Sequence, residues 1–201
     1  NYGATNAKTI APGGANIRLS GKQLYPINSV TITGNVLSDT STLVEISHSH
    51  DVTVSGNTFF APMPNNLIVE NSQRVVASSN TFNPRQFVRP GIIRFTKCKD
   101  CVLSNSTLYQ LATDRGGVQL TECTGCLVSG LLLSECKSGI RLNKTNNTTI
   151  SNCRVSGTPE KSFDLLVDQT NDKIKIHGNS FEGFIVFNPN SQESQKHNSF
   201  A

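Results

Sequence analysis

Apolar and polar residues follow a seven-residue pattern that recurs along most of the chain. The pattern is an apolar residue, two small or polar residues, Asn and, two positions later, a second apolar residue. It reads TITGNVL at 31–37, TVSGNTF at 53–59, VASSNTF at 76–82 and KIHGNSF at 175–181, and copies without the Asn lie at 102–108, 127–133 and 149–155. The last apolar residues of successive copies are 22 to 26 residues apart. This period is typical of one turn of a β-solenoid and is too short for helical-pair repeats.

A second pair of apolar residues, two positions apart, precedes each of the five middle copies. The pairs are Val44 and Ile46, Leu67 and Val69, Ile93 and Phe95, Val118 and Leu120, and Ile140 and Leu142. Such alternation predicts a strand with one buried side. Each repeat therefore predicts a strand, a polar turn, a second strand, a corner, a short third strand and a variable loop, and no stretch has the spacing of a helix.

Stacking of equivalent strands predicts an all-β fold, a right-handed parallel β-helix of about seven turns of 22–26 residues with three short strands per turn. We expect a single β-helix domain over residues 1–201, with repeats from about 16 to 187 and a polar tail at 188–201. The sequence leaves open whether this domain is part of a longer chain.

Asparagine recurs at the corner between the second and third predicted strands. Asn35, Asn57 and Asn80 share this position, which Ser106, Leu131 and Cys153 occupy in later turns before Asn179 resumes it. Because Asn tolerates a left-handed backbone better than most residues, we expect it to adopt that conformation at the bend. We also expect the stacked amides to hydrogen-bond along the coil axis as a ladder.

These repeats resemble those of the pectate-lyase-like right-handed β-helix superfamily, whose turns combine an apolar pair, four or five polar residues and a Val-x-Ile-Ser-Gly-Asn-x-Phe phrase. The resemblance covers roughly residues 16–187. The superfamily also includes polygalacturonases, alginate and chondroitin lyases, and phage tailspikes. The resemblance therefore implies the fold and leaves the function open.

The composition agrees with a repetitive fold. Hydrophobic residues make up 36% of the 201 residues and charged residues 16%, whereas Asn, Ser and Thr together make up nearly a third. In register, these polar residues occupy corners, turns and outer faces. No run of 18 apolar residues occurs, which argues against a membrane span. The net charge of +4 is dispersed, which argues against a nucleic-acid partner and is compatible with an acidic ligand.

Six cysteines include two C-x-x-C pairs, Cys98 with Cys101 and Cys123 with Cys126. The repeat places Cys98 beside Cys123 and Cys101 beside Cys126 in consecutive turns. We favour stacked, buried free thiols, which behave as small hydrophobic residues. Disulfides between the stacked turns and a four-thiolate zinc site are the alternatives.

Function is expected on outward positions, because inward residues form the core. Glu45, Arg94, Gln119 and Arg141 share one outward column, and Glu70, Lys97 and Lys144 lie in the positions that follow it. The resulting basic face suits the carboxylates or sulfates of an acidic polysaccharide or oligosaccharide. Arg89 and Arg115 stand in the two longest loops, which are expected to form one wall of a cleft.

In the resembled lyases the cleft follows this first sheet, a Lys or Arg acts as the base, and acidic residues often hold calcium. The resemblance therefore implies Arg94, Lys97 and Arg141 as candidates for a base or a substrate contact, and Glu45 and Glu70 as candidates for an acid or a metal ligand. We take Arg94, Lys97, Glu70 and Arg141 as the catalytic candidates, and the outward columns and loops add Glu45, Gln119, Lys144, Arg89 and Arg115 as substrate contacts. Calcium is the possible cofactor, without a definite metal site. The alternative is a solvated charge ladder on this face. His48 and His50 are interpreted as solvated turn residues, with a weak metal site as the alternative.

Two functions follow from these features, and whether the chain is an enzyme stays open. The first is a carbohydrate-active protein, extracellular or periplasmic and a monomer or trimer, that binds or cleaves an acidic polysaccharide. A lyase is favoured over a hydrolase, because the outward acids are dispersed and a hydrolase needs two carboxylates about 5 to 9.5 Å apart. The second is a non-catalytic module or spacer of a larger extracellular, surface or tailspike-like protein.

Overall fold

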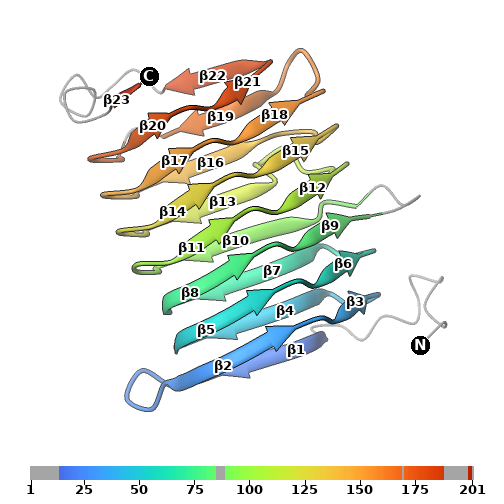
Figure 1. The fold of residues 1–201 in the computed structure, drawn as a ribbon, viewed down its shortest axis with the longest axis vertical. Coiled ribbons are helices and arrows are strands. Elements are labelled where there is room, and N and C mark those ends of the chain that lie inside the picture. Colours follow the sequence, from blue (N-terminus) through green and yellow to red (C-terminus); the bar gives the residue numbers. More distant parts are fainter. Residues whose placement is uncertain (1–13, 85–88, 169, 188–198, 201) are drawn as a thin grey trace.

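The computed structural model describes residues 14–84, 89–168, 170–187 and 199–200, which form a parallel β-helix (Figure 1). All the regular elements of these residues are strands. Each turn adds one strand to each of three parallel sheets of eight, eight and seven strands, which confirms the predicted architecture. The turns are stacked from the N-terminal end at the bottom of Figure 1 to the C-terminal end at the top.

The strand bounds follow the predicted repeat. Sheet 1 contains β1 (Ala15–Ser20), β4 (Thr42–Ser47), β7 (Asn65–Glu70), β10 (Ile92–Thr96), β13 (Val118–Thr121), β16 (Ile140–Asn143), β19 (Phe163–Val167) and β22 (Phe184–Phe187). Sheet 2 contains β2 (Ile27–Thr33), β5 (Ser49–Ser55), β8 (Gln73–Ser78), β11 (Val102–Ser104), β14 (Leu127–Ser129), β17 (Thr149–Ser151), β20 (Lys175–His177) and β23 (Ser199–Phe200). Sheet 3 contains β3 (Val36–Ser38), β6 (Thr58–Phe60), β9 (Thr81–Asn83), β12 (Thr107–Tyr109), β15 (Leu132–Ser134), β18 (Arg154–Ser156) and β21 (Ser180–Phe181).

The core consists of the predicted inward columns. The apolar pairs of sheet 1 are stacked in register, so that Val44 lies beside Leu67 and Ile46 beside Val69, and all four side chains are fully buried. On sheet 3, Phe59 and Phe82 are stacked with ring centroids 4.6 Å apart. A chain with a modest apolar fraction thus concentrates its hydrophobic surface along one axis.

The asparagine ladder forms, although the left-handed residue differs from the prediction. Asn57 Oδ1 accepts a hydrogen bond from the Asn35 backbone N–H at 2.9 Å, and Asn80 Oδ1 accepts one from the Asn57 N–H at 2.9 Å. The left-handed conformation belongs to the preceding residue, which is Gly34 with φ 68° and Gly56 with φ 63°. The prediction was wrong on this point because the Gly turns the backbone, which leaves the Asn side chain free to reach the next turn.

The cysteines lie in the core, as predicted from the sequence. All six are buried, and in this structure none of them is joined in a disulfide. Cys101 continues the inward column of Val52 and Val75, since the Val75 N–H points to Cys101 Sγ at 3.4 Å. Within the described ranges there is no helix long and apolar enough to cross a membrane. The predicted polar tail lies outside the described residues except for β23.

Candidate functional site

The outward side of sheet 1 carries the predicted basic residues, and carboxylates lie beside them. Glu45 Oε2 accepts from Arg18 at 3.0 Å, and Glu70 lies 3.7 Å from Arg94. Arg141 Nε donates to Asp168 Oδ2 at 2.9 Å. These are partly exposed pairs between neighbouring turns, each contributing about 0 to 1 kcal/mol to stability. Their main effect is to cancel much of the positive charge expected on this face.

The other predicted site residues are spread over three parts of the coil. Lys97, just after β10, lies 4.0 Å from Glu122, and Lys144 is exposed at the equivalent position after β16. Gln119 on β13 donates to the backbone carbonyl of Gly116 at 2.9 Å.

Arg89 and Arg115 belong to the loops that follow sheet 3. Arg89 lies beside Leu111 in an isolated parallel bridge. Arg115 is exposed in the turn before β13, and its N–H donates to Thr113 Oγ1 at 3.2 Å. The structure thus brings Glu70 and Arg94 together on adjoining turns of sheet 1, places Lys97 at the corner after β10 beside Glu122, and holds the two loop arginines on a separate part of the coil.

A cavity of about 380 Å³ lies at the corner between sheets 1 and 2, over the first four turns. It combines basic, amide and hydroxyl side chains. Its lining residues are Lys22, Gln23, Pro26, His48, His50, Asn71, Ser72, Gln73, Lys97 and Lys99. We refer to this cavity as the corner pocket.

The repeat places the pocket residues in two columns. His48, Asn71 and Lys97 are the corner residues of successive turns, with φ of 46°, 48° and 53°. This left-handed backbone ends the sheet 1 strand sharply and starts the next strand. His50 pairs with Gln73, and Gln73 pairs with Lys99, so these side chains form a second column beside the first.

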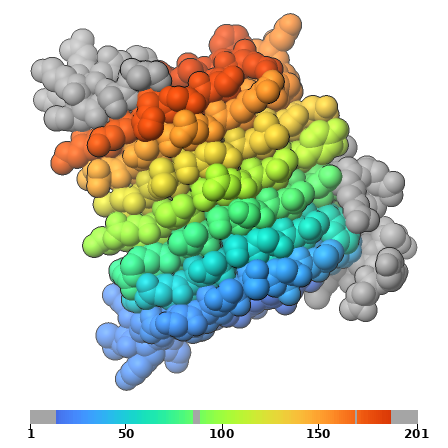
Figure 2. Space-filling view, in the orientation of Figure 1, coloured from blue at the N-terminus to red at the C-terminus, as the bar shows by residue number. Residues whose placement is uncertain are grey.

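The loop between β1 and β2 forms the wall of the pocket. Lys22 and Tyr25 close it through a two-residue antiparallel bridge, with N–H to carbonyl distances of 3.0 and 2.9 Å. In Figure 2 this loop projects from the lower left of the molecule, in dark blue. Leu24 and Tyr25 at its tip are 82% and 76% exposed. The loop therefore brings Lys22 and exposed apolar surface to the mouth of the cavity.

The lining of the pocket is basic, although Lys97 also lies 4.0 Å from Glu122, which is not part of the lining. Of the described residues that line it, three are lysines, two are histidines and none is acidic. The nearby Asp51 carboxylate is held by Arg74, whose Nε and Nη2 donate to it at 2.6 and 2.9 Å. These hydrogen bonds hold the pKa of Asp51 below its ordinary value. The electrostatics of the pocket favour an anion.

Most of these pocket residues were not assigned a role from the sequence. His48 and His50 were interpreted as solvated turn residues, and Lys22, Gln73 and Lys99 were not singled out. Aligning the turns would have placed His50, Gln73 and Lys99 in one column. The β1–β2 loop lies outside the repeat, so no pattern predicted that it would close over these columns. Within the described ranges, no group of three or more His, Cys, Asp or Glu side chains could hold a metal ion.

Comparison with known families identifies one match. A family model described as "Periplasmic copper-binding protein (NosD)" matches residues 4–200. No curated protein matches the chain. The match supports a parallel β-helix without pointing to the pectate-lyase-like superfamily in particular. It also agrees with the predicted location, because the family is periplasmic.

Proposed function

The chain belongs to the NosD family, and from this premise we propose that it is a periplasmic β-helix protein that binds acidic saccharides in the corner pocket. The observation that carries the proposal is the set of five basic side chains around one cavity whose described lining has no acid. Lysine and protonated histidine donate charge-assisted hydrogen bonds to carboxylates and sulfates. The cavity volume also falls in the range of small-molecule sites, about 300–1,000 Å³.

A saccharide is favoured over a simple anion by the rest of the pocket. Asn71 and Gln73 offer amide donors and acceptors of the kind that hydroxyl groups bind. Tyr25, 76% exposed, offers an amphipathic ring on the loop that supplies the lining residues Lys22, Gln23 and Pro26. A sugar ring has hydroxyls and an apolar face as well as its acidic group, so it uses all three features. Inorganic sulfate would use the cations alone.

Binding without cleavage is favoured by the ion pairs on sheet 1. A base that removes the proton next to a uronate carboxylate must itself be neutral. Arg94 and Arg141 are instead each engaged by a carboxylate, Glu70 and Asp168. The proposal therefore keeps the predicted binding of an acidic saccharide and agrees with the non-catalytic alternative. It places the saccharide contacts in the corner pocket instead of on sheet 1.

The described residues do not fit a resident copper ion, although the family description names copper. His48 and His50 supply two imidazoles to the corner pocket, but Lys22, Lys97 and Lys99 line the same cavity and repel a cation. Thiols suit Cu(I), but those of the two C-x-x-C turns are at most 4% exposed. The described chain also has no group of three or more ligating side chains placed to hold a metal. The proposed function involves neither copper nor calcium.

Calorimetric titration of the 201-residue chain tests the proposal. The ligands are oligogalacturonate, oligoalginate and a chondroitin sulfate disaccharide, compared with a neutral oligosaccharide of equal length and with inorganic sulfate and phosphate. We expect at least one acidic saccharide to bind and the neutral one not to. Lys99→Gln is expected to weaken that binding about tenfold, because it removes a hydrogen bond to a charged group. Added salt is expected to weaken binding further.

Lys144→Gln is the matched control, because Lys144 is an exposed corner lysine two turns beyond the pocket. It should leave the affinity unchanged. If Lys99→Gln binds like the wild type and Arg94→Gln does not bind, the site lies on sheet 1 and the pocket proposal is wrong. If the pocket binds free sulfate as tightly as the saccharide, it recognises the anionic group alone and the saccharide assignment is wrong. A rise in ultraviolet absorbance from unsaturated uronates would show cleavage and overturn the binding-only assignment.

A further inference from the structure

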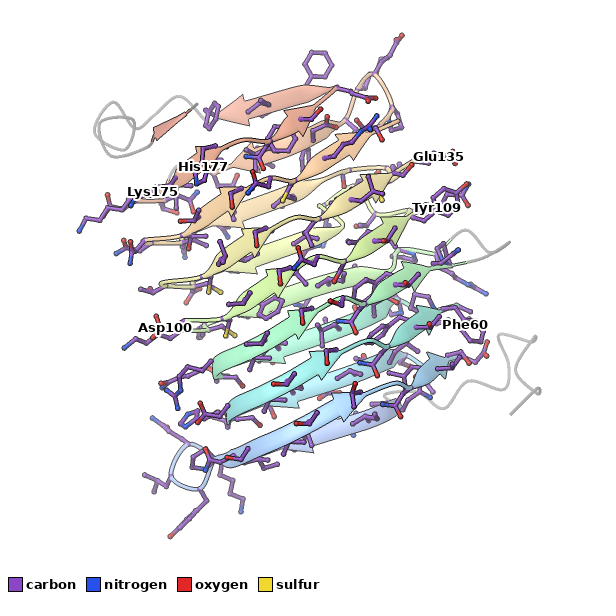
Figure 3. All side chains as sticks on the ribbon, in the orientation of Figure 1. Phe60, Asp100, Tyr109, Glu135, Lys175 and His177 are labelled. Atoms are coloured by element: carbon purple, nitrogen blue, oxygen red, sulfur yellow. The ribbon has the colours of Figure 1, made fainter. Side chains whose placement is uncertain are left out.

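Four thiols meet at the same corner, inside the coil. Cys98 and Cys101 flank the turn between β10 and β11, and Cys123 and Cys126 flank the next turn in the same way. The strands before these turns pair in register, and Lys99 pairs with Thr124 between them. Cys98 is therefore stacked on Cys123 and Cys101 on Cys126. Asp100, labelled in Figure 3, marks the outer side of this corner. We call these four cysteines the thiol quartet.

The members of the quartet contact one another. The Cys98 side chain contacts those of Cys101 and Cys123, and the Cys126 side chain contacts the same two. All four are at most 4% exposed. The thiol of Cys136 points to the backbone carbonyls of Leu108 and Ser134, as the quartet thiols point to carbonyls of their own turns. Cys136 differs from the quartet because no cysteine is among the groups that act on its thiol.

The compartment and the geometry both favour oxidation. Disulfides form and persist in the periplasm, which is where the family is found. Equivalent Cα atoms in adjacent parallel strands are about 4.8 Å apart, within the separation of about 4.4–6.8 Å found across disulfides. The side chains of each stacked pair are already in contact, and bond formation requires their Cβ atoms to approach to about 3.5–4.5 Å. We infer that the quartet closes into two disulfides, Cys98–Cys123 and Cys101–Cys126, which tie two consecutive turns of the coil together.

The chemistry requires a disulfide oxidant, which we assign to the class of periplasmic thiol oxidases with an active-site disulfide. One cysteine thiolate attacks that disulfide, forms a mixed disulfide and releases one oxidant thiolate. The partner cysteine then loses its proton and displaces the second oxidant sulfur. Formation of each disulfide thus removes two protons and two electrons from the protein, and the oxidant is reduced to a dithiol.

Disulfides between turns are expected to stabilise the protein more than disulfides within each C-x-x-C turn. Each bond spans 25 positions, from 98 to 123 and from 101 to 126. A disulfide stabilises mainly by restricting the unfolded chain, and the effect grows with loop length. Because the sulfurs are buried once the coil has formed, exchange takes place before these turns close. The bonds would hold the middle of the solenoid, next to Lys97 and Lys99 of the corner pocket.

Thiol counting on the chain secreted into a bacterial periplasm tests the inference. The protein is denatured and alkylated with and without prior reduction, and its mass is measured. We expect two of the six cysteines, Cys136 and Cys153, to react before reduction and all six to react after it. Fragmentation of the linked peptides is expected to show the two bonds between turns. Reduction should lower the melting temperature by about 5–10 °C.

Cys136→Ala is the matched control, because Cys136 is a buried thiol outside the quartet. It should retain both disulfides and leave one free thiol. The inference is wrong if all six cysteines of the secreted wild type react without reduction, or if the bonds join Cys98 to Cys101 and Cys123 to Cys126. The inference is also wrong if the peptides contain no disulfide and a chelator makes the four cysteines accessible to alkylation, because a bound metal would then protect them.

Discussion

Asn57→Ala removes the most connected amide of the ladder. The Asn57 side chain is 2% exposed. Its Oδ1 accepts from the backbone N–H and the Nδ2 of Asn35 at 2.9 and 3.0 Å. Its Nδ2 donates to the Ile32 carbonyl at 3.0 Å and to Asn80 Oδ1 at 3.1 Å. One side chain therefore joins three consecutive turns.

The loss of stability in Asn57→Ala follows from the backbone groups that lose a hydrogen-bond partner. The Ile32 carbonyl loses a donor and the Asn35 N–H loses its acceptor. An unsatisfied buried group costs about 1–3 kcal/mol, so we expect a total loss of about 2–4 kcal/mol. In a chain of this size, that loss lowers the melting temperature by about 4–16 °C. Thermal and urea unfolding followed by circular dichroism measure both quantities.

Two further variants separate the ladder from general effects of truncation. Ser106 already serves in the ladder, where its Oγ accepts from the Asn80 N–H at 3.1 Å. Asn57→Ser should therefore keep an acceptor for the Asn35 N–H and lose about half as much stability as Asn57→Ala. Asn35→Ala, at the partly exposed start of the ladder, should cost less than about 1 kcal/mol. If Asn57→Ala unfolds within about 0.5 kcal/mol of the wild type, the ladder does not stabilise the coil.

Two further predictions concern a glycine corner and an exposed ion pair. Gly125→Ala should lose about 1 kcal/mol more than Gly34→Ala, as measured by urea midpoints. Both residues have positive φ, but an added Cβ at Gly125 would lie 2.3 Å from a carboxylate oxygen of the previous turn, and at Gly34 it meets nothing within 4 Å; equal losses would contradict this. For Asp51→Asn, we expect less stability than wild type at pH 7 and convergence in acid. The arginine partner lowers the folded pKa of Asp51, so the pair's contribution is present above the unfolded value of about 3.9 and is lost as the pH falls through the folded value. A difference unchanged at pH 2 would refute it.

The coil could be predicted because its constraints are local and repeated. Each inward residue, such as Ile46 or Val69, meets the equivalent residue of the next turn, so a period of 22 to 26 residues already specifies its neighbours. The same logic found the ladder of Asn57 and Asn80. It failed for the left-handed residue, because conformation and side-chain bonding fall on different residues, Gly56 and Asn57.

The sequence by itself determined the architecture of this protein, its buried columns and the stacking of Cys98 on Cys123. The tertiary structure alone decided where positive charge remains. On sheet 1 it placed Asp168, from outside the outward column, beside Arg141, and at the corner it closed an irregular loop over His48 and Lys99. The physical reason is that buried apolar contacts are strong and follow the repeat. The register also brings some charged residues side by side, such as Arg18 and Glu45. Exposed ion pairs are worth only about 0 to 1 kcal/mol, however, and the position of the irregular β1–β2 loop follows from no local pattern.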